Sequence, residues 1–195
     1  KLVRGGQQVR MSRRAGAFVT LADILDEVDS DVCRLTFLLQ SIDTAQTFDL
    51  DVVTAQSMEN PVYYVQYAHA RAVSIDRRAS VAGVTRLPIL ETDLAPLRHE
   101  RELDLLRALD TYADVVAEAA TLRAPHRVTT WVRELAALFH GFYRDCRVLS
   151  DDAALTQSRL WLSEAARVGL ANALGLLGVG APDEMTHLDA DDDTP

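Results

Sequence analysis

Apolar residues recur every three or four positions over most of the chain, which is the spacing of one face of an α-helix. From residue 57 onward this periodicity predicts four long helices with short connections, over residues 57–79, 105–119, 124–149 and 150–178. The apolar positions of the second of these are Leu105, Leu109, Tyr112, Val116 and Ala119. Amphipathic helices joined in this way form a bundle, so the pattern predicts a mainly all-α protein.

The residues between and at the ends of these helices support the same reading. Pro61 is tolerated in the first turn of a helix, Ser150 is a suitable N-cap for the last helix, and Gly178 is a suitable terminator. Residues 80–98 contain one glycine and two prolines, which predicts a loop. Residues 41–51 are polar and irregular, and we expect a connector there.

The first forty residues follow a different pattern. Residues 1–19 are basic and dotted with glycine, which predicts a short strand or hairpin ending in a loop. Thr20 followed by Asp23 is a variant of the capping box and predicts a short helix. A second helix should begin near Asp29 or Ser30, with its apolar side formed by Val32, Leu35, Leu38 and Leu39. No strand pattern of comparable quality follows residue 20.

Composition is that of a globular protein of 195 residues, with 48% hydrophobic and 25% charged residues. This length suits one domain, or one and a half smaller ones. No run of eighteen apolar residues is present, so we expect no membrane span, and no signal peptide is visible. Cys33 and Cys146 lack the spacing of a metal site or a disulfide framework. We interpret both as buried thiols, which favours a reducing, cytoplasmic setting.

The formal net charge of −9 by itself argues against a nucleic-acid partner. The distribution of that charge along the chain weakens the argument. Residues 1–14 carry five basic side chains and no acid, whereas residues 183–195 carry six acids and no Lys or Arg. An acidic protein can still bind a polyanion through a local basic patch. All basic residues except Lys1 are arginine, so arginine is expected where related motifs use lysine. Because the chain begins with Lys1, we expect a fragment or a processed product.

General chemical motifs are absent from the sequence. It contains no Gly-x-x-x-x-Gly-Lys phosphate loop, no Gly-x-Ser-x-Gly elbow and no His-x-x-x-His zinc pair. We interpret His126 and His140 as packing or capping residues and predict no metal site. Two stretches remain to be explained, "VRMSRRAG" at residues 9–16 and "ENPVYYVQYAHAR" at residues 59–71.

These stretches resemble parts of one enzyme family. "VRMSRRAGAFVTL" resembles the Lys-Met-Ser-Lys-Ser loop of class I aminoacyl-tRNA synthetases in its arginine-specific form. "ENPVYYVQYAHAR" is similar to the opening helix of the anticodon-binding domain of arginyl-tRNA synthetases. "PHRVTTWVRELAALFHGFYRDCRVL" and "LLGVGAPDEM" resemble the later helices and the C-terminal end of the same enzymes. The four matches follow the family's order and span about residues 8–185.

The resemblance implies a role for the basic loop. In the family, this loop closes over ATP and stabilises the developing charge on its phosphates, which requires mobile cations and glycine hinges. Position by position, the family's motif falls on Arg10, Met11, Ser12, Arg13 and Arg14. Arg13 would contact the triphosphate and Ser12 would help to hold the loop. Arginine replaces both lysines of the motif, and its larger, planar head changes the expected contacts.

The resemblance also implies an RNA-binding helix. It places Tyr64 and Tyr67 beside the anticodon stem-loop, where unstacked bases can stack on aromatic rings. Arg71, one turn further, could reach a phosphate, and Met185 would approach the anticodon from the C-terminal end. From the residues alone, tyrosines three positions apart are equally explained as half-buried core residues. Two polar side chains on this helix are left unranked, Asn60 and Gln66.

Together these expectations describe the C-terminal portion of an arginyl-tRNA synthetase. Residues 1–51 would hold the end of the catalytic domain with the signature loop and stem-contact helices, residues 52–188 an all-α anticodon-binding domain, and residues 189–195 a disordered acidic tail. The parent enzyme would join L-arginine to tRNA-Arg with ATP and Mg²⁺, in the cytoplasm and as a monomer. This chain lacks the family's His-x-Gly-His element and should be inactive alone.

Two alternatives of other classes remain open on sequence grounds. One is a stand-alone tRNA-binding module without catalysis, which predicts RNA affinity that falls steeply with salt. The other is a helical protein–protein interaction domain with the tyrosines in its core. It predicts no RNA affinity and an exposed apolar helix face.

Overall fold

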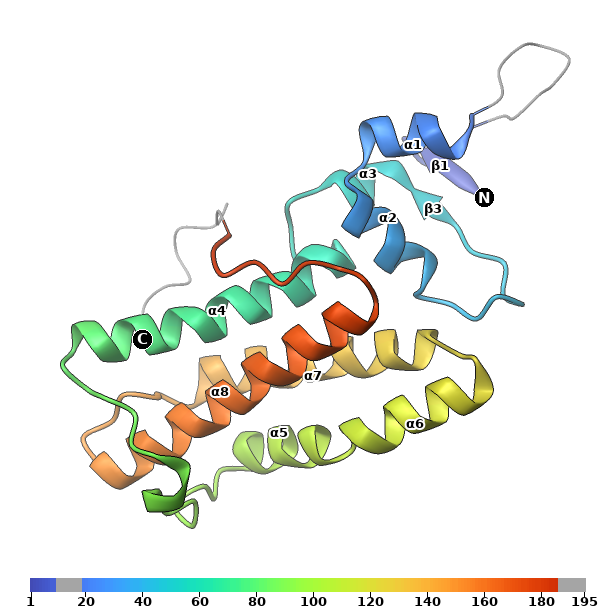
Figure 1. Cartoon of the computed structure of the whole chain (residues 1–195). Coiled ribbons are helices and arrows are strands. Elements are labelled where there is room, and N and C mark those ends of the chain that lie inside the picture. The colour runs from blue at the N-terminus through green and yellow to red at the C-terminus, as the bar shows by residue number, and fades with distance from the viewer. Residues whose placement is uncertain (10–18, 186–195) are drawn as a thin grey trace, which may run out of the picture.

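The computed structural model describes residues 1–9 and 19–185. A small N-terminal unit packs at one end of a larger helical bundle (Figure 1). The unit comprises β1 (Leu2–Arg4), β2 (Gln7–Gln8), α1 (Leu21–Glu27), α2 (Ser30–Phe37), β3 (Phe48–Asp49) and α3 (Leu50–Thr54). The bundle comprises α4 (Pro61–Val81), the short 3₁₀ helix η2 (Ile89–Glu91), α5 (Glu100–Asp110), α6 (Tyr112–Leu122), α7 (His126–Asp145) and α8 (Ala153–Leu176). The mainly all-α fold class is confirmed.

The N-terminal hairpin is confirmed over the residues that the structure describes. β1 pairs antiparallel with β2, and both residues of the connecting turn, Gly5 and Gly6, have positive φ angles of 58° and 71°. Such angles favour glycine, because a side chain would clash with the backbone. β1 also pairs in parallel with β3, which gives the strand order β2-β1-β3.

β3 and α3 correct the expectation of an irregular connector over residues 41–51. A two-residue strand has no periodicity to detect, and β3 exists because β1 offers its free edge, with Leu2 opposite Phe48. α3 follows at once, capped by the side chain of Asp49, which accepts a hydrogen bond from the Asp51 N–H at 3.1 Å. β3 therefore depends on tertiary pairing with β1, and α3 depends on one local cap.

The predicted starts of α1 and α2 are confirmed. Thr20 and Asp23 form both hydrogen bonds of a capping box at the start of α1. Asp29 caps α2, its carboxylate accepting from the Asp31 N–H at 2.8 Å. Short polar side chains at these positions replace hydrogen bonds that the first turn of a helix lacks.

Two hydrophobic cores hold the molecule together. The smaller one consists of Leu2, Val28, Cys33, Phe48, Leu50 and Val53. The predicted domain boundary after residue 51 therefore falls inside α3, whose Leu50 and Val53 both pack in this small core. α2 joins the two cores, because its Cys33 packs in the small one and its Leu35 in the large one.

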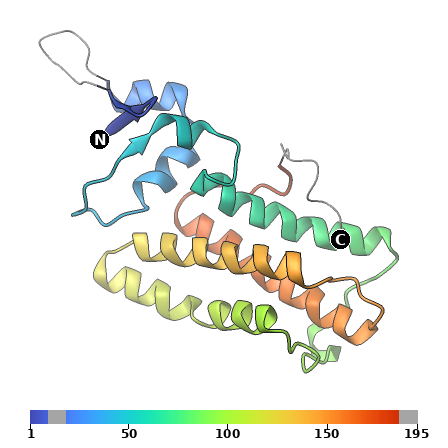
Figure 2. The same cartoon turned by 180° about the vertical axis from the view of Figure 1, so that it is seen from behind.

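α7 is the central helix of the bundle, and it contacts α4, α5, α6 and α8. Figure 2 shows α7 beside α5 and α6 from the side opposite to Figure 1. The core at these contacts includes fully buried side chains from three helices, Leu105, Leu135, Phe139, Phe142, Leu160 and Leu170. Cys146 is also buried, as predicted for both cysteines. No helix in the described part of the chain is long and apolar enough to cross a membrane.

The helices of the bundle differ from the sequence expectation in their bounds and in one division. The single helix predicted over residues 105–119 is two helices, α5 and α6, joined at Thr111. The carbonyl oxygen of Ala108 accepts from the Trp131 indole N–H (2.9 Å) and from the Thr111 hydroxyl (2.8 Å), and such side-chain donors compete with the helix's own ladder. α8 is capped by Asp152 instead of Ser150, since the Asp152 carboxylate accepts from the Ala154 and Leu155 N–H groups. Its predicted terminator is confirmed, with Gly178 at φ +67°.

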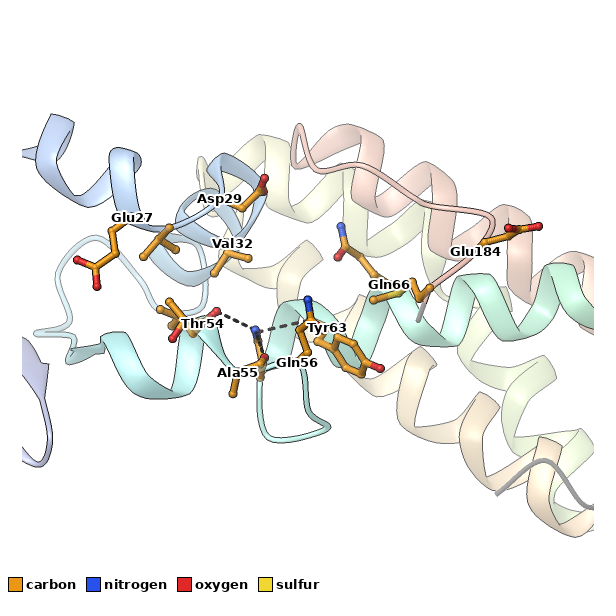
Figure 3. Close-up of a pocket in the computed structure, with 13 residues that line it drawn as sticks. Glu27, Asp29, Val32, Thr54, Ala55, Gln56, Tyr63, Gln66 and Glu184 are labelled. Atoms are coloured by element: carbon orange, nitrogen blue, oxygen red, sulfur yellow. Dashed lines mark hydrogen bonds between the residues drawn. The ribbon is translucent and has the colours of Figure 1, made fainter. Parts of the chain in front are cut away.

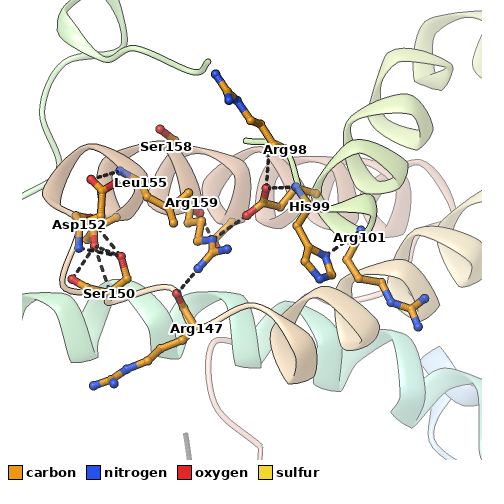
Figure 4. Close-up of polar contacts among 12 residues, drawn as sticks. Arg98, His99, Arg101, Arg147, Ser150, Asp152, Leu155, Ser158 and Arg159 are labelled. Atoms are coloured by element: carbon orange, nitrogen blue, oxygen red, sulfur yellow. Dashed lines mark hydrogen bonds and ion pairs between the residues drawn. The ribbon is translucent and has the colours of Figure 1, made fainter. Parts of the chain in front are cut away.

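A buried polar network ties α5 to α8 (Figure 4). The Glu102 carboxylate accepts from the Arg159 Nε–H at 2.6 Å with one oxygen, and from the Arg98 and His99 N–H groups at 2.8 Å with the other. Arg159 also donates to the carbonyl oxygen of Arg147 at 2.7 Å. The network therefore joins the start of α5, the second turn of α8 and the connection between α7 and α8.

Candidate nucleic-acid interface along helix α4

The C-terminal segment, residues 178–185, lies against helix α4. The Gln66 side-chain N–H donates to the carbonyl oxygen of Gly180 at 3.0 Å. One turn further along α4, the buried His69 ring donates from Nδ1 to the carbonyl oxygen of Pro182 at 2.9 Å. Because a carbonyl oxygen can only accept, this contact fixes the proton on Nδ1. Two residues of α4 thus hold the path of the segment.

Helix α2 holds the same segment from the other side. The Asp31 carboxylate accepts from the Gly180 N–H at 2.7 Å, and the Arg34 guanidinium donates to the carbonyl oxygen of Gly178. A Cβ atom at Gly178 would lie 2.8 Å from Nη1 of Arg34, the movable end of a flexible side chain, so the positive φ of 67° is the main reason for glycine there. The chain beyond α8 is therefore docked on both α2 and α4.

A hollow of about 440 Å³ lies between α2, the α3–α4 connection and α4 (Figure 3). We call it the acidic hollow, because carboxylates of Glu27, Asp29 and Glu184 line it. Tyr63 contributes an aromatic ring and Met185 an adaptable apolar side chain. Its lining offers hydrogen-bond acceptors and an aromatic surface, and its charge disfavours an anion.

A second hollow, of about 380 Å³, lies further along α4. We call it the arginine hollow, because α4 contributes the guanidinium groups of Arg71, Arg77 and Arg78 to it. The rest of the lining is formed by Tyr67, Ala70 and Ser74 of the same helix and by Asp183, Glu184 and Met185 of the C-terminal segment. Glu184 and Met185 line both hollows, so the end of the C-terminal segment separates them. The positive charge of this second site suits an anionic group.

The rings of Tyr63 and Tyr67 connect the two hollows. They are stacked, with centroids 5.8 Å apart and planes 13° from parallel, and one lines each hollow. Residues four apart on a helix lie one above the other, which places Tyr63 with Tyr67. The family resemblance points to Tyr64 and Tyr67, whereas the spacing of four along the helix pairs Tyr67 with Tyr63.

Tyr64 lies elsewhere, packed on α7. Its ring is 4.7 Å from the ring of His140, at 60°. Burial raises the pKa of Tyr64, and the charge of Arg133 opposes that shift. The structure therefore brings Tyr67 and Met185 together at the arginine hollow and places Tyr64 outside the lining of both hollows.

Arg71 is fixed inside the wall of the arginine hollow, with a relative exposure of 7%. Its guanidinium carbon lies 4.6 Å from the ring centroid of Tyr67 and 4.4 Å from that of Tyr143, a cation–π sandwich. It also donates to the Tyr67 hydroxyl at 3.1 Å. Its positive charge is thus held in one place before any ligand arrives.

His140 completes this arrangement from α7. Its Nδ1 lies 3.3 Å from Arg71 Nη1 and its Nε2 lies 3.2 Å from the carbonyl oxygen of Tyr64. A guanidinium can only donate, so Nδ1 accepts and the Nε2–H donates to the carbonyl. The tautomer follows from the two partners. His140 is a packing residue, as predicted.

Asn60 is a structural residue. Its side-chain oxygen accepts from the Val62 and Tyr63 N–H groups, and its side-chain nitrogen donates to the carbonyl oxygens of Val53 and Ala55 at 2.8 and 2.9 Å. All four bonds fix the connection between α3 and α4. Of the two polar candidates left unranked, only Gln66 belongs to the interface by contact with the C-terminal segment.

The loop residues Arg10, Met11, Ser12, Arg13 and Arg14 lie outside the described residues. Over residues 1–9 and 19–185, no three His, Cys, Asp or Glu side chains come close enough together to hold a metal ion.

Comparison with known proteins connects this helix to a family. Residues 65–185 match the model of the DALR anticodon binding domain, and the match includes most of α4 and the whole C-terminal segment up to Met185. An arginine–tRNA ligase from Syntrophotalea carbinolica is 50% identical over 184 residues, 94% of this chain and 33% of that protein. An arginine–tRNA ligase from Frankia alni is 50% identical over 189 residues, 94% of this chain and 34% of that protein.

A solved structure gives the same relation. The arginyl-tRNA synthetase of Thermus thermophilus superposes with a TM-score of 0.72 at 26% sequence identity, over 94% of this chain and 34% of that one. The chain thus spans about one third of the length of the curated relatives that it matches. Since the family model covers more than half of the chain, the chain belongs to the DALR anticodon binding domain family.

Proposed function

We propose that the chain is the C-terminal part of an arginine–tRNA ligase and that its bundle binds tRNA-Arg at the anticodon stem-loop. Membership of the family and the identity to arginine–tRNA ligases support this proposal. We propose that the anticodon-binding domain extends from about residue 52 to residue 188.

The observation that carries the proposal is that Tyr63 and Tyr67 of α4 each line a hollow beside Met185. Both rings are buried, with relative exposures of 8% and 7%, and they stack on each other, so they offer a ligand a ring edge and not an open face. Proteins bind the bases of single-stranded RNA loops by stacking them on aromatic rings and contacting their edges. Phosphates in turn are bound by arginine. α4 offers both kinds of group within one helical turn, so we assign a base contact to Tyr67 and Met185 and phosphate attraction to Arg71.

For the whole enzyme we propose the reaction of its relatives, in which ATP drives the attachment of L-arginine to tRNA-Arg with Mg²⁺. Arg10, Met11, Ser12, Arg13 and Arg14 would face the phosphates of ATP, and residues 1–51 would belong to the catalytic part. Cationic side chains there would stabilise negative charge that develops on the phosphates. We assign this activity to a cytoplasmic monomer, and none to the present chain by itself.

The test is binding of this chain to a tRNA-Arg transcript, compared with the same transcript mutated in the anticodon and with an unrelated tRNA. Tyr67→Ala should weaken binding by about 0.5–1.5 kcal/mol, the usual net contribution of one hydrogen bond, because it removes an edge contact to a base. Tyr64→Ala, at the position selected from the sequence, should weaken binding less. Tyr112→Ala removes a tyrosine that packs on Trp131 far along the chain and serves as the control.

Each variant would first be checked for cooperative thermal unfolding. Equal binding to all three RNAs would contradict anticodon recognition. A loss of affinity in Tyr112→Ala as large as that in Tyr67→Ala would show that folding, and not contact with a base, controls the result.

A further inference from the structure

The side chains that line the arginine hollow include carboxylates. Glu184 of the C-terminal segment forms an ion pair with Arg77 of α4, with 2.7 Å between Oε1 and Nη2. Both residues line the arginine hollow, together with the fixed guanidinium of Arg71. A carboxylate therefore occupies the place on Arg77 that a phosphate oxygen would take.

Four hydrogen bonds position the C-terminal segment that carries Glu184, and none of them involves the Glu184 side chain. They are the hydrogen bonds of Gln66 and His69 to the carbonyls of the C-terminal segment and those of Asp31 and Arg34 from α2. The position of the carboxylate thus follows from how the segment is docked. The ion pair is not needed to hold the segment.

The exposure of the pair shows that it contributes little to folding. The side chains of Arg77 and Glu184 are 56% and 74% exposed, and ion pairs of this kind add little stability because water and salt screen them. The same exposure lets a ligand reach Arg77. Binding of a polyanion is more sensitive than folding to the charge of this pair, because each phosphate that a protein neutralises adds to the affinity and to its dependence on salt.

We propose that Glu184 competes with nucleic-acid phosphate for Arg77, and so sets how tightly this surface binds the RNA backbone. The inference rests on the proposed function, since it assumes that the anion is a phosphate of bound RNA. In the free protein Arg77 is neutralised by Glu184. On binding, a phosphate takes its place and the carboxylate turns to solvent. Backbone affinity that is independent of sequence is thereby reduced, while contacts to the bases are unaffected.

The test is the substitution Glu184→Gln in the full 195-residue chain. Gln keeps the size of the side chain and removes its charge. Affinity for tRNA-Arg at low salt should rise by about two- to fivefold, the effect of one exposed charge pair. The affinity should also fall more steeply with salt, since Arg77 then gains one phosphate without losing a carboxylate. The slope of log affinity against log salt concentration should become steeper by about 0.7.

Two controls make the test specific. Glu118→Gln removes an equivalent exposed pair with Arg127 (3.0 Å) that lies away from both hollows, and it changes the net charge by the same amount. It should leave the affinity nearly unchanged. In an Arg77→Gln background, Glu184→Gln should have no further effect, because the group for which it competes is gone.

Titration with inorganic pyrophosphate, followed through the NMR signals of the arginine Nε–H groups, tests the competition without RNA. The Arg77 signal should respond at lower pyrophosphate concentration in Glu184→Gln than in the unaltered chain. An equal response in both proteins would overturn the inference even if RNA binding failed. An effect of Glu118→Gln on RNA affinity equal to that of Glu184→Gln would also overturn it. Absence of RNA binding by every variant would instead contradict the proposed function, and the titration would still decide the role of Glu184.

Discussion

At the residue scale, Glu102 is a buried carboxylate whose stability depends on its partners. Its side chain is 1% exposed, and a buried carboxylate is tolerated only when it is paired and hydrogen-bonded. Both oxygens have partners, the Arg159 guanidinium and two backbone N–H groups at the start of α5. The same group thus caps one helix and neutralises a side chain of another.

Glu102→Ala should lower the free energy of unfolding by about 3–5 kcal/mol, because it leaves Arg159 without its buried partner. Urea unfolding measures this loss. Glu118→Ala, which removes an exposed pair, is the matched control and should change stability by less than about 1 kcal/mol. Equal losses in the two variants would contradict a special role of the buried network.

At the scale of the element, the side chains that cap α4 and α8 differ in what else they bind. Asn60 caps α4 through its oxygen and binds the carbonyls of Val53 and Ala55 through its nitrogen. Asp152 caps α8 at an exposed position, and its carboxylate accepts only from the N–H groups of that helix's first turn. An amide is therefore required at one cap and a carboxylate is sufficient at the other.

Asn60→Asp should destabilise the protein by about 1–3 kcal/mol, although aspartate is a good N-cap. It keeps the acceptor but places a carboxylate oxygen against two carbonyl oxygens in a buried site. The reverse exchange, Asp152→Asn, should stay within about 0.5 kcal/mol, since asparagine and aspartate are similar caps. Thermal unfolding of the two variants provides the comparison, and a larger loss at Asp152 would refute the distinction.

At the scale of the whole molecule, the ion pairs and hydrogen bonds of several carboxyl groups couple folding to pH. The Arg167 guanidinium binds both oxygens of Glu164, at 2.7 and 2.8 Å, and with Arg86 it lowers the pKa of that carboxyl below 4.5 against the opposing effect of burial. Hydrogen bonds from the Thr20 N–H and hydroxyl lower the pKa of Asp23 below 3.8, and hydrogen bonds from Arg144 and Arg101 lower that of Asp145 below 3.8. Arg86, from the loop after α4, joins α4 and α8 by pairing with both Asp76 and Glu164.

Because these carboxyl groups take up protons more readily in the unfolded chain, stability is complete above the unfolded pKa values and falls as the pH drops through the folded ones. We therefore expect the urea midpoint to decrease below about pH 4.5, the ordinary pKa of glutamate. Glu164→Gln should make this decrease shallower. An identical pH dependence in the variant and the unaltered protein would show that Glu164 does not contribute.

The sequence by itself determined the elements whose signals are local. The 3.6-residue period gave the long helices, Thr20 with Asp23 gave the start of α1, and Gly178 gave the end of α8. Each of these depends on groups within about one turn of the chain, so no distant partner is needed. The family resemblance likewise rested on order and spacing along the chain.

Tertiary structure alone decided the rest. β3 forms because β1 is beside it, the helix over residues 105–119 divides at Thr111 because Trp131 reaches the Ala108 carbonyl, and Leu50 with Val53 joins the small core. At the candidate interface, packing on α7 turns Tyr64 away and leaves Tyr63 and Tyr67 beside the hollows. The docked C-terminal segment brings Glu184 to Arg77, over a hundred residues away in the chain. Such contacts carry no local pattern, because they join residues whose proximity is created only when the chain folds.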